Sequence, residues 1–108
     1  VRYADTLGIA IPGRIYQAVW ALKQISGLDI GIHAHNDFGM AVANSLAALA
    51  AGAAYVDCTL HGIGERAGNC DYYKLVRLLP AYGYRDGFSS WNNCYHRCAE
   101  IHIDLCRG

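Results

Sequence analysis

The chain has 108 residues, of which 54% are hydrophobic and 17% are charged, and its formal net charge is zero. This composition suits one small folded domain and excludes a disordered chain. Without a basic run the sequence predicts no nucleic-acid partner, and its longest apolar stretch, residues 41–54, is too short to span a bilayer, so no membrane partner is expected.

The chain opens on Val1, already within an apparent strand, and has neither an initiator Met nor a secretory signal. We therefore expect it to be a piece of a longer polypeptide. The chain has an odd number of cysteines, and the simplest explanation is that they are free thiols in a reducing compartment. This predicts a cytoplasmic protein. The five are Cys58, Cys70, Cys94, Cys98 and Cys106.

The first part of the chain alternates between predicted strands and a helix. Residues 1–6 are typical of a short strand, and Pro12 suits the first turn of the helix that follows. Spacings of three and four predict one buried face on this helix, which ends near Gly27. That face consists of Ile15, Val19, Leu22 and Ile25. A second strand is then expected from residue 29 up to Asp37, which lies past its end.

The same alternation continues along the chain. A helix is predicted over residues 39–51, where many alanines favour helix and allow close packing on a sheet. Asp37 or a neighbouring residue is placed to cap this helix, and its buried stripe is Val42, Leu46 and Leu49. A third strand is expected over 54–60, with Cys58 on its core face, and a third helix over 72–79, capped by Asp71.

This order of elements, β-α-β-α-β-α, predicts an α/β fold of parallel strands joined by right-handed crossovers. The period is regular, because Thr6 to His33 is 27 residues and His33 to Thr59 is 26. A (β/α)8 TIM barrel uses about 30 residues per unit and places its site where the strands end, although an open doubly wound sheet fits the alternation too. If the fold is a barrel, about five strands lie outside this chain.

His33 and His35 are candidate metal ligands at the end of the second strand. At a spacing of two on a strand both imidazoles face one way, which makes a natural ligand pair. Asn69 lies within a loop's reach of the same edge. The mixed N/O set suits Mg²⁺, Mn²⁺ or Zn²⁺ and leaves positions open for substrate oxygens. Two ordinary histidines, one of them buried and hydrogen-bonded, are the alternative.

Such a site calls for a carboxylate, which the neighbouring residues do not readily supply. Asp5 has the wrong strand parity, and Asp37 lies past the strand, where it would act as a cap or an outer partner. In the loop over residues 61–69, Glu65 and Arg66 form either a local ion pair that holds the loop's shape, which the pattern favours, or a direct contact to substrate.

Three motifs resemble one enzyme family. The stretch from His33 to Asn44, HAHNDFGMAVAN, resembles the HxHND-x-G-x-A-x-AN signature of the isopropylmalate synthase and homocitrate synthase family. Residues 62–69, GIGERAGN, resemble its GxGERAGN loop, and residues 4–8, ADTLG, its ADTxG strand end. The motifs occur in the family's order and cover about residues 1–79. They are similar to the sixth, seventh and eighth units of a metal-dependent barrel.

The resemblance implies a partial (β/α)8 barrel over residues 1–80 that belongs to an acyltransferase. The family condenses acetyl-CoA with a 2-oxo acid, using a divalent metal as a Lewis acid. It implies His33, His35 and Asn69 as metal ligands, and Thr6, Glu65 and Arg66 as candidate substrate-binding residues. The family's remaining ligand, an Asp at the end of the first strand, is absent from this chain. A homodimer is implied for the full-length protein, and the general base is unassigned.

Two alternatives stay open. One is a metal-dependent lyase or aldolase of the same barrel superfamily, against which the Glu65-Arg66 form of the loop argues. The other is a truncated, non-catalytic chain. For the isolated 108 residues we expect weak metal binding and no turnover.

The resemblance fades after Pro80, and residues 81–108 form a tail of unknown role. Its predicted structure is an irregular loop followed by a helix, because four potential metal ligands recur every fourth residue. They are Cys94, Cys98, His102 and Cys106. On one helix the first and last lie about 18 Å apart, so one ion cannot bind all four. A loosely packed thiol face is the favoured interpretation.

Overall fold

The computed structural model describes residues 2–5, 10–64, 66–82, 84–93 and 99–107, with side chains described as far as residue 82. Three βα units come first. They comprise β1 (Arg2–Asp5), α1 (Pro12–Ser26), β2 (Gly31–Ala34), α2 (Ala41–Ala50), β3 (Tyr55–Thr59) and α3 (Tyr72–Leu78). Short 3-10 turns, η1 (Leu60–Gly62) and η2 (Leu79–Tyr82), flank α3. The predicted alternation of strands and helices is therefore confirmed.

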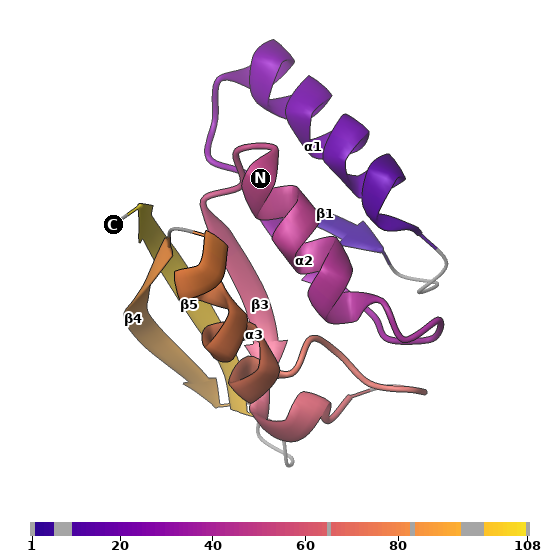
Figure 1. Cartoon of the computed structure of the whole chain (residues 1–108), viewed down its shortest axis with the longest axis vertical. Helices are drawn as coiled ribbons and strands as arrows, with labels where there is room; N and C mark the ends of the chain where they lie inside the picture. The colour runs from indigo at the N-terminus through magenta and orange to yellow at the C-terminus, as the bar shows by residue number, and fades with distance from the viewer. Residues whose placement is uncertain (1, 6–9, 65, 83, 94–98, 108) are drawn as a thin grey trace.

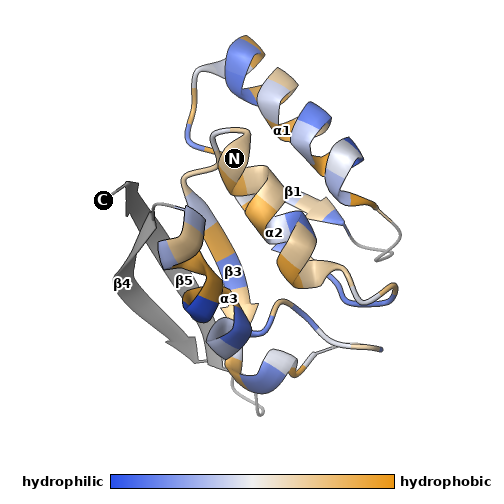
Figure 2. Ribbon diagram, viewed as in Figure 1, coloured by the Kyte–Doolittle hydropathy of each residue, from blue (hydrophilic) through white to orange (hydrophobic). Residues whose placement is uncertain are grey.

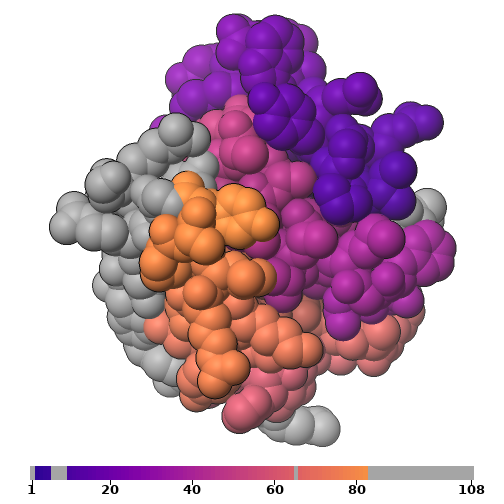
Figure 3. All heavy atoms as spheres, viewed as in Figure 1, coloured from indigo at the N-terminus to yellow at the C-terminus, as the bar shows by residue number. Residues whose placement is uncertain are grey.

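The strands form one sheet in the order β1-β2-β3-β5-β4. β1, β2 and β3 are parallel, with Ala4 opposite His33 and His33 opposite Asp57. The three helices lie against one face of the sheet, as Figure 1 shows. In the space-filling view of Figure 3 the side chains of these helices cover that face. Among the described helices, none is long and apolar enough to cross a membrane.

Alternate residues of β2 and β3 build the core beneath the helices. Ile32, Ala34, Val56 and Cys58 are buried and pack against Ile15, Val19, Ala48, Leu49 and Leu75. Cys58 is thus a core residue, as its strand parity predicts. The opposite parity carries His33, Asp57 and Thr59, so polar side chains share the other face of the sheet.

Helix α1 begins at Pro12 and ends before Gly27, which adopts φ 64° and donates its N–H to the carbonyl of Lys23. Both ends are as predicted. The predicted buried face holds for Ile15 and Val19, but Ile25 is 85% exposed. Ten residues at 3.6 per turn place Ile25 about 80° around the helix from Ile15, which takes it off the buried face.

Helix α2 buries small side chains. Its buried residues are Ala41, Asn44, Ser45, Ala48 and Leu49, while the predicted Val42 and Leu46 are only partly buried. Figure 2 shows α2 as mostly apolar, whereas α1 and α3 mix apolar and polar residues. Ala41, Ser45 and Ala48 are small and let the helix approach the sheet closely, whereas Leu49 and Asn44 are among the largest fully buried side chains.

The tail differs from its predicted irregular and helical form. Strands β4 (Tyr84–Asn93) and β5 (Ala99–Arg107) form an antiparallel hairpin, and β5 also pairs antiparallel with β3. Cys94 and Cys98 lie outside the described residues, and His102 and Cys106 belong to β5. The aromatic and β-branched residues of the tail favour strands, and the edge of β3 provides backbone N–H and carbonyl groups with which β5 pairs. The domain boundary predicted at residue 80 falls in η2 and stays a prediction.

Candidate metal centre

The carboxyl ends of β1, β2 and β3 meet at one edge of the sheet, where the candidate ligands lie. His33 belongs to β2, and His35 follows the strand's last residue. Their ring centroids are 5.1 Å apart, and the ring planes meet at 72°. His35 is 8% exposed, and its Nδ1 is buried without a hydrogen-bond partner. The predicted side-by-side pair of imidazoles is therefore present.

Asn69 reaches the histidines through a backbone bridge. Its backbone pairs with that of His35, and the N–H of Asn36 donates to the carbonyl of Gly68 at 2.8 Å. The Asn69 side-chain Nδ2 donates to the Ile63 carbonyl at 3.3 Å. Its Oδ1 is buried and has no partner. The loop after β3 is thus tied directly to the end of β2.

Two buried atoms without a hydrogen-bond partner, His35 Nδ1 and Asn69 Oδ1, are of the kinds that bind divalent cations. A buried polar atom without a partner costs about 1–3 kcal/mol, so such atoms are rare in native proteins and call for an explanation. An imidazole nitrogen and an amide oxygen are both metal ligands, and a divalent cation bound at this place would satisfy them. Within the described part of the chain, no three His, Cys, Asp or Glu side chains cluster closely enough to hold a metal.

Asp57 supports His33 from the neighbouring strand. The Asp57 Oδ2 lies 3.3 Å from His33 Nδ1 and 2.8 Å from Arg2 Nε. Its side chain is only 6% exposed. We did not single out this residue from the sequence. The available signal was its place on the polar face of β3 next to the histidine strand.

The loop after β3 depends on its glycines. A Cβ at Gly64 would lie 2.4 Å from Asn69 Nδ2, and one at Gly68 would lie 2.2 Å from the Gly62 carbonyl oxygen. Gly68 also adopts φ 104°, a conformation that side chains disfavour. These glycines therefore leave room for the Asn69 amide and for the backbone that carries it.

Arg66 pairs with Asp37, which lies in the loop after β2. Its Nε and Nη2 donate to the two carboxylate oxygens at 2.7 and 3.2 Å. The hydrogen bond from Arg66 holds the pKa of Asp37 below its ordinary value of 3.8. Of the predicted caps of α2, Asp37 or a neighbouring residue, it is the neighbour Asn36 whose Oδ1 accepts from the Ala41 N–H at 3.1 Å. The ion pair therefore joins two loops, where the sequence favoured a local pair with Glu65.

Of the other predicted site residues, Thr6 and Glu65 lie outside the described residues. Asp5 is buried and its carboxylate accepts from the Ala10 N–H at 3.3 Å, so it holds the chain after β1. Cys70 is fully buried next to Asn69, and burial raises the pKa of its thiol to about 12. A neutral, buried thiol fills space here and is not a nucleophile.

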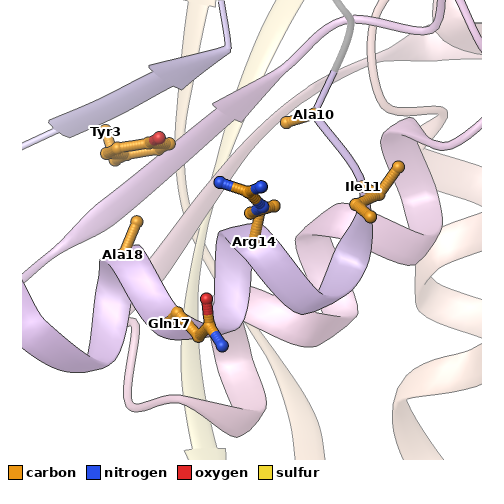
Figure 4. A pocket seen from close by; sticks show the side chains of 6 residues that line it. All are labelled: Tyr3, Ala10, Ile11, Arg14, Gln17 and Ala18. Carbon is orange, nitrogen blue, oxygen red and sulfur yellow. The ribbon is translucent and has the colours of Figure 1, made fainter.

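Two hollows lie near these elements. One of about 180 Å³ adjoins Asn69 and is also lined by Asn36, His61 and Lys74, but neither His33 nor His35 lines it. The other, of about 680 Å³, lies between β1 and α1 and is lined by Tyr3, Ala10, Ile11, Arg14, Gln17 and Ala18 (Figure 4). Tyr3 has the opposite parity to Ala4 and His33, so this second hollow is separate from the metal centre.

Parallel βα units with two histidines and an amide at the strand ends define a segment of a (β/α)8 barrel with a candidate metal centre. The HMGL-like family model matches residues 1–101, and the chain belongs to this family. The predicted fold, a partial (β/α)8 barrel with an added tail, is confirmed in its three parallel units.

Both synthases and cleaving enzymes occur among the similar proteins. The chain is 53% identical over 79 residues to the homocitrate synthase subunit alpha of Clostridium pasteurianum, covering 73% of this chain and 29% of that protein. It is 44% identical over 87 residues to the 4-hydroxy-2-oxovalerate aldolase of Pelotomaculum thermopropionicum, covering 81% and 26%. The structure of an HMG-CoA lyase from Acinetobacter baumannii matches with a TM-score of 0.68 and 30% identity, covering 76% and 29%. The chain thus spans less than a third of the length of these proteins.

Proposed function

We propose that the chain forms the metal-binding segment of an acyltransferase that condenses acetyl-CoA with a 2-oxo acid. The observation that carries the proposal is the convergence of His33, His35 and Asn69, with two buried atoms that lack partners. The resemblance of the three motifs to homocitrate and isopropylmalate synthases supports the reaction class, and so does the 53% identity to a homocitrate synthase subunit.

In this proposal His33, His35 and Asn69 hold a Mg²⁺, Mn²⁺ or Zn²⁺ ion. When bound, the ion supplies Lewis acidity that polarises the carbonyl of the 2-oxo acid for attack by the acetyl enolate. Thr6 binds the carboxylate of the 2-oxo acid. Arg66 and Glu65 shape or contact the substrate site from the loop, and the Arg66–Asp37 pair keeps that loop next to the end of β2. The general base is left unassigned.

The reaction is tested in the complete protein by the release of free CoA thiol. Acetyl-CoA is offered with Mg²⁺, Mn²⁺ or Zn²⁺ and a series of 2-oxo acids. We expect thiol release only when the matching 2-oxo acid is present, and loss of release in His33→Ala. Asp29→Asn, a surface change at a residue whose side chain is 81% exposed, serves as the control and leaves the rate unchanged. Thiol release without any 2-oxo acid would contradict the proposal.

A lyase or aldolase on the same metal centre is the second candidate, favoured by the aldolase and lyase similarities. Such an enzyme would form acetyl-CoA by cleaving a hydroxyacyl-CoA thioester, or an aldehyde by cleaving a hydroxy-2-oxo acid, with no thiol release in the first assay. The Glu65-Arg66 loop resembles the synthases, which is why condensation is preferred. Absence of both reactions in the complete protein would leave the non-catalytic alternative.

A further inference from the structure

One buried carboxylate links all three parallel strands to the candidate metal centre. Asp57 on β3 faces His33 on β2, with which it is in register, and Arg2 on β1 reaches the same carboxylate oxygen. Arg2 is half exposed, whereas the Asp57 side chain is 6% exposed. A buried carboxylate is stable only when it is paired and hydrogen-bonded, and these two groups provide that pairing.

The contact acts on a particular ring nitrogen of His33. The Asp57 oxygen lies 3.3 Å from Nδ1, and a carboxylate only accepts hydrogen bonds, so Nδ1 must carry the proton. In a neutral imidazole the other nitrogen, Nε2, then keeps its lone pair. A metal ligand needs that lone pair, and the partner on the other nitrogen fixes the orientation of the ring.

The neighbouring histidine has no such partner among the described residues. Nδ1 of His35 is buried without a hydrogen bond, although the two rings lie 5.1 Å apart. The two candidate ligands are therefore held differently. Asp57 fixes the proton of His33, while His35 is positioned by its strand and by the backbone bridge to Asn69.

We propose that Asp57 is a positioning residue that fixes His33 in the Nδ1–H tautomer and presents Nε2 to the metal, with Arg2 holding the carboxylate in place. The presentation of Nε2 to a metal rests on the proposed metal centre. The Nδ1–H tautomer of His33 does not, because it exists with or without the ion. The contacts that support this role share one atom, because the Asp57 Oδ2 lies against both His33 and Arg2.

The tautomer is measured first, in the metal-free complete protein with ¹⁵N-labelled histidine. Long-range ¹H–¹⁵N spectra at about pH 8, where an ordinary histidine is neutral, distinguish the two ring nitrogens. His33→Gln identifies its signals by their absence. We expect His33 to carry its proton on Nδ1. A proton on Nε2 in this unaltered protein would overturn the proposal, and this test requires no variant of Asp57 to fold.

The consequence for the metal is measured with Asp57→Asn and the surface control Asp29→Asn. Removal of such an outer partner weakens metal binding about 10- to 100-fold, and we expect this loss in Mn²⁺ titrations of Asp57→Asn. The same variant should populate both His33 tautomers, which a merely structural change would not cause. An unchanged tautomer together with Mn²⁺ affinity equal to that of Asp29→Asn would overturn the proposal.

Failure of the proposed function is distinguishable from failure of this inference. If the unaltered protein binds no Mn²⁺, Mg²⁺ or Zn²⁺, the proposed metal centre is wrong. An Nδ1–H tautomer that depends on Asp57 would still support the positioning contact in that case. If the protein binds metal tightly and His33 carries its proton on Nε2, the metal centre stands and the role of Asp57 is refuted.

Discussion

Replacement of Gly68 by alanine is expected to destabilise the protein markedly, because the backbone at this position suits only glycine. Gly68 adopts φ 104°, and an added Cβ would lie 2.2 Å from the carbonyl oxygen of Gly62. That oxygen belongs to the backbone and accepts the N–H of Asn69, so it cannot rotate away as a side chain would. The loop must shift as a whole.

The expected loss in the free energy of unfolding is judged against the same glycine-to-alanine change at another position. Holding a side chain in such a conformation costs about 1–3 kcal/mol, and we take about 2 kcal/mol before any cost of the contact with Gly62. Gly13 lies in α1 and has no atom within 4 Å of an added Cβ. Gly13→Ala is therefore expected to stabilise the protein by about 0.5–1 kcal/mol. The two variants should differ by about 3 kcal/mol.

Urea denaturation of the two variants and the unaltered protein, followed by circular dichroism, measures this difference. Gly68→Ala should also weaken Mn²⁺ binding, because Gly68 accepts the Asn36 N–H and precedes Asn69. Gly13→Ala should leave Mn²⁺ affinity unchanged. Variants whose free energies of unfolding agree within about 0.5 kcal/mol would refute the reasoning.

Three further outcomes are expected. Arg66 lowers the pKa of Asp37 from 3.8, so their pair contributes stability above about pH 4 and loses it as the pH falls through the lowered pKa. Urea denaturation should accordingly show Arg66→Gln less stable than the unaltered protein at pH 6, with the difference shrinking as the pH falls through the lowered pKa, and a difference that does not shrink would contradict the pairing. Cys70, with its pKa raised to about 12, should resist alkylation at pH 8 in the native protein and react in urea, and rapid native alkylation would count against its burial. The isolated 108-residue chain should bind Mn²⁺ only weakly in titration calorimetry, because its three candidate ligands are uncharged, and tight stoichiometric binding would contradict this.

Local patterns predicted the elements of the three βα units because each depends on residues near in sequence. Pro12, Gly27 and Asp71 marked helix ends, and the structure places them there, with the Asp71 carboxylate accepting from the Tyr73 N–H. Strand parity also placed His33 and His35 on one face. These are the parts of the fold and of the candidate site that sequence reasoning could supply.

Contacts between segments that are distant in sequence could not be predicted from such local patterns. Asp37 was expected near α2, yet it pairs with Arg66, 29 residues later. Asp57 has a polar-face parity, but only the register between β2 and β3 places it next to His33. The predicted structure of the tail was wrong for a related reason. Cys and His residues that recur at every fourth position favoured a helix. Pairing with β3, more than 40 residues away, instead stabilises β5 as a strand.

The hairpin gives the two borders of the parallel part of the sheet, β1 and β3, different capacities for growth. β5 pairs along β3 from Tyr55 to Thr59, so the outward-facing N–H and carbonyl groups of β3 are already engaged. Among the described strands, β1 pairs only with β2, which leaves its other side as an open template. An incoming strand can extend the ladder at β1, but at β3 it must first displace the hairpin. Among the described strands, direct addition to the parallel part of the sheet is thus open at β1 and blocked at β3.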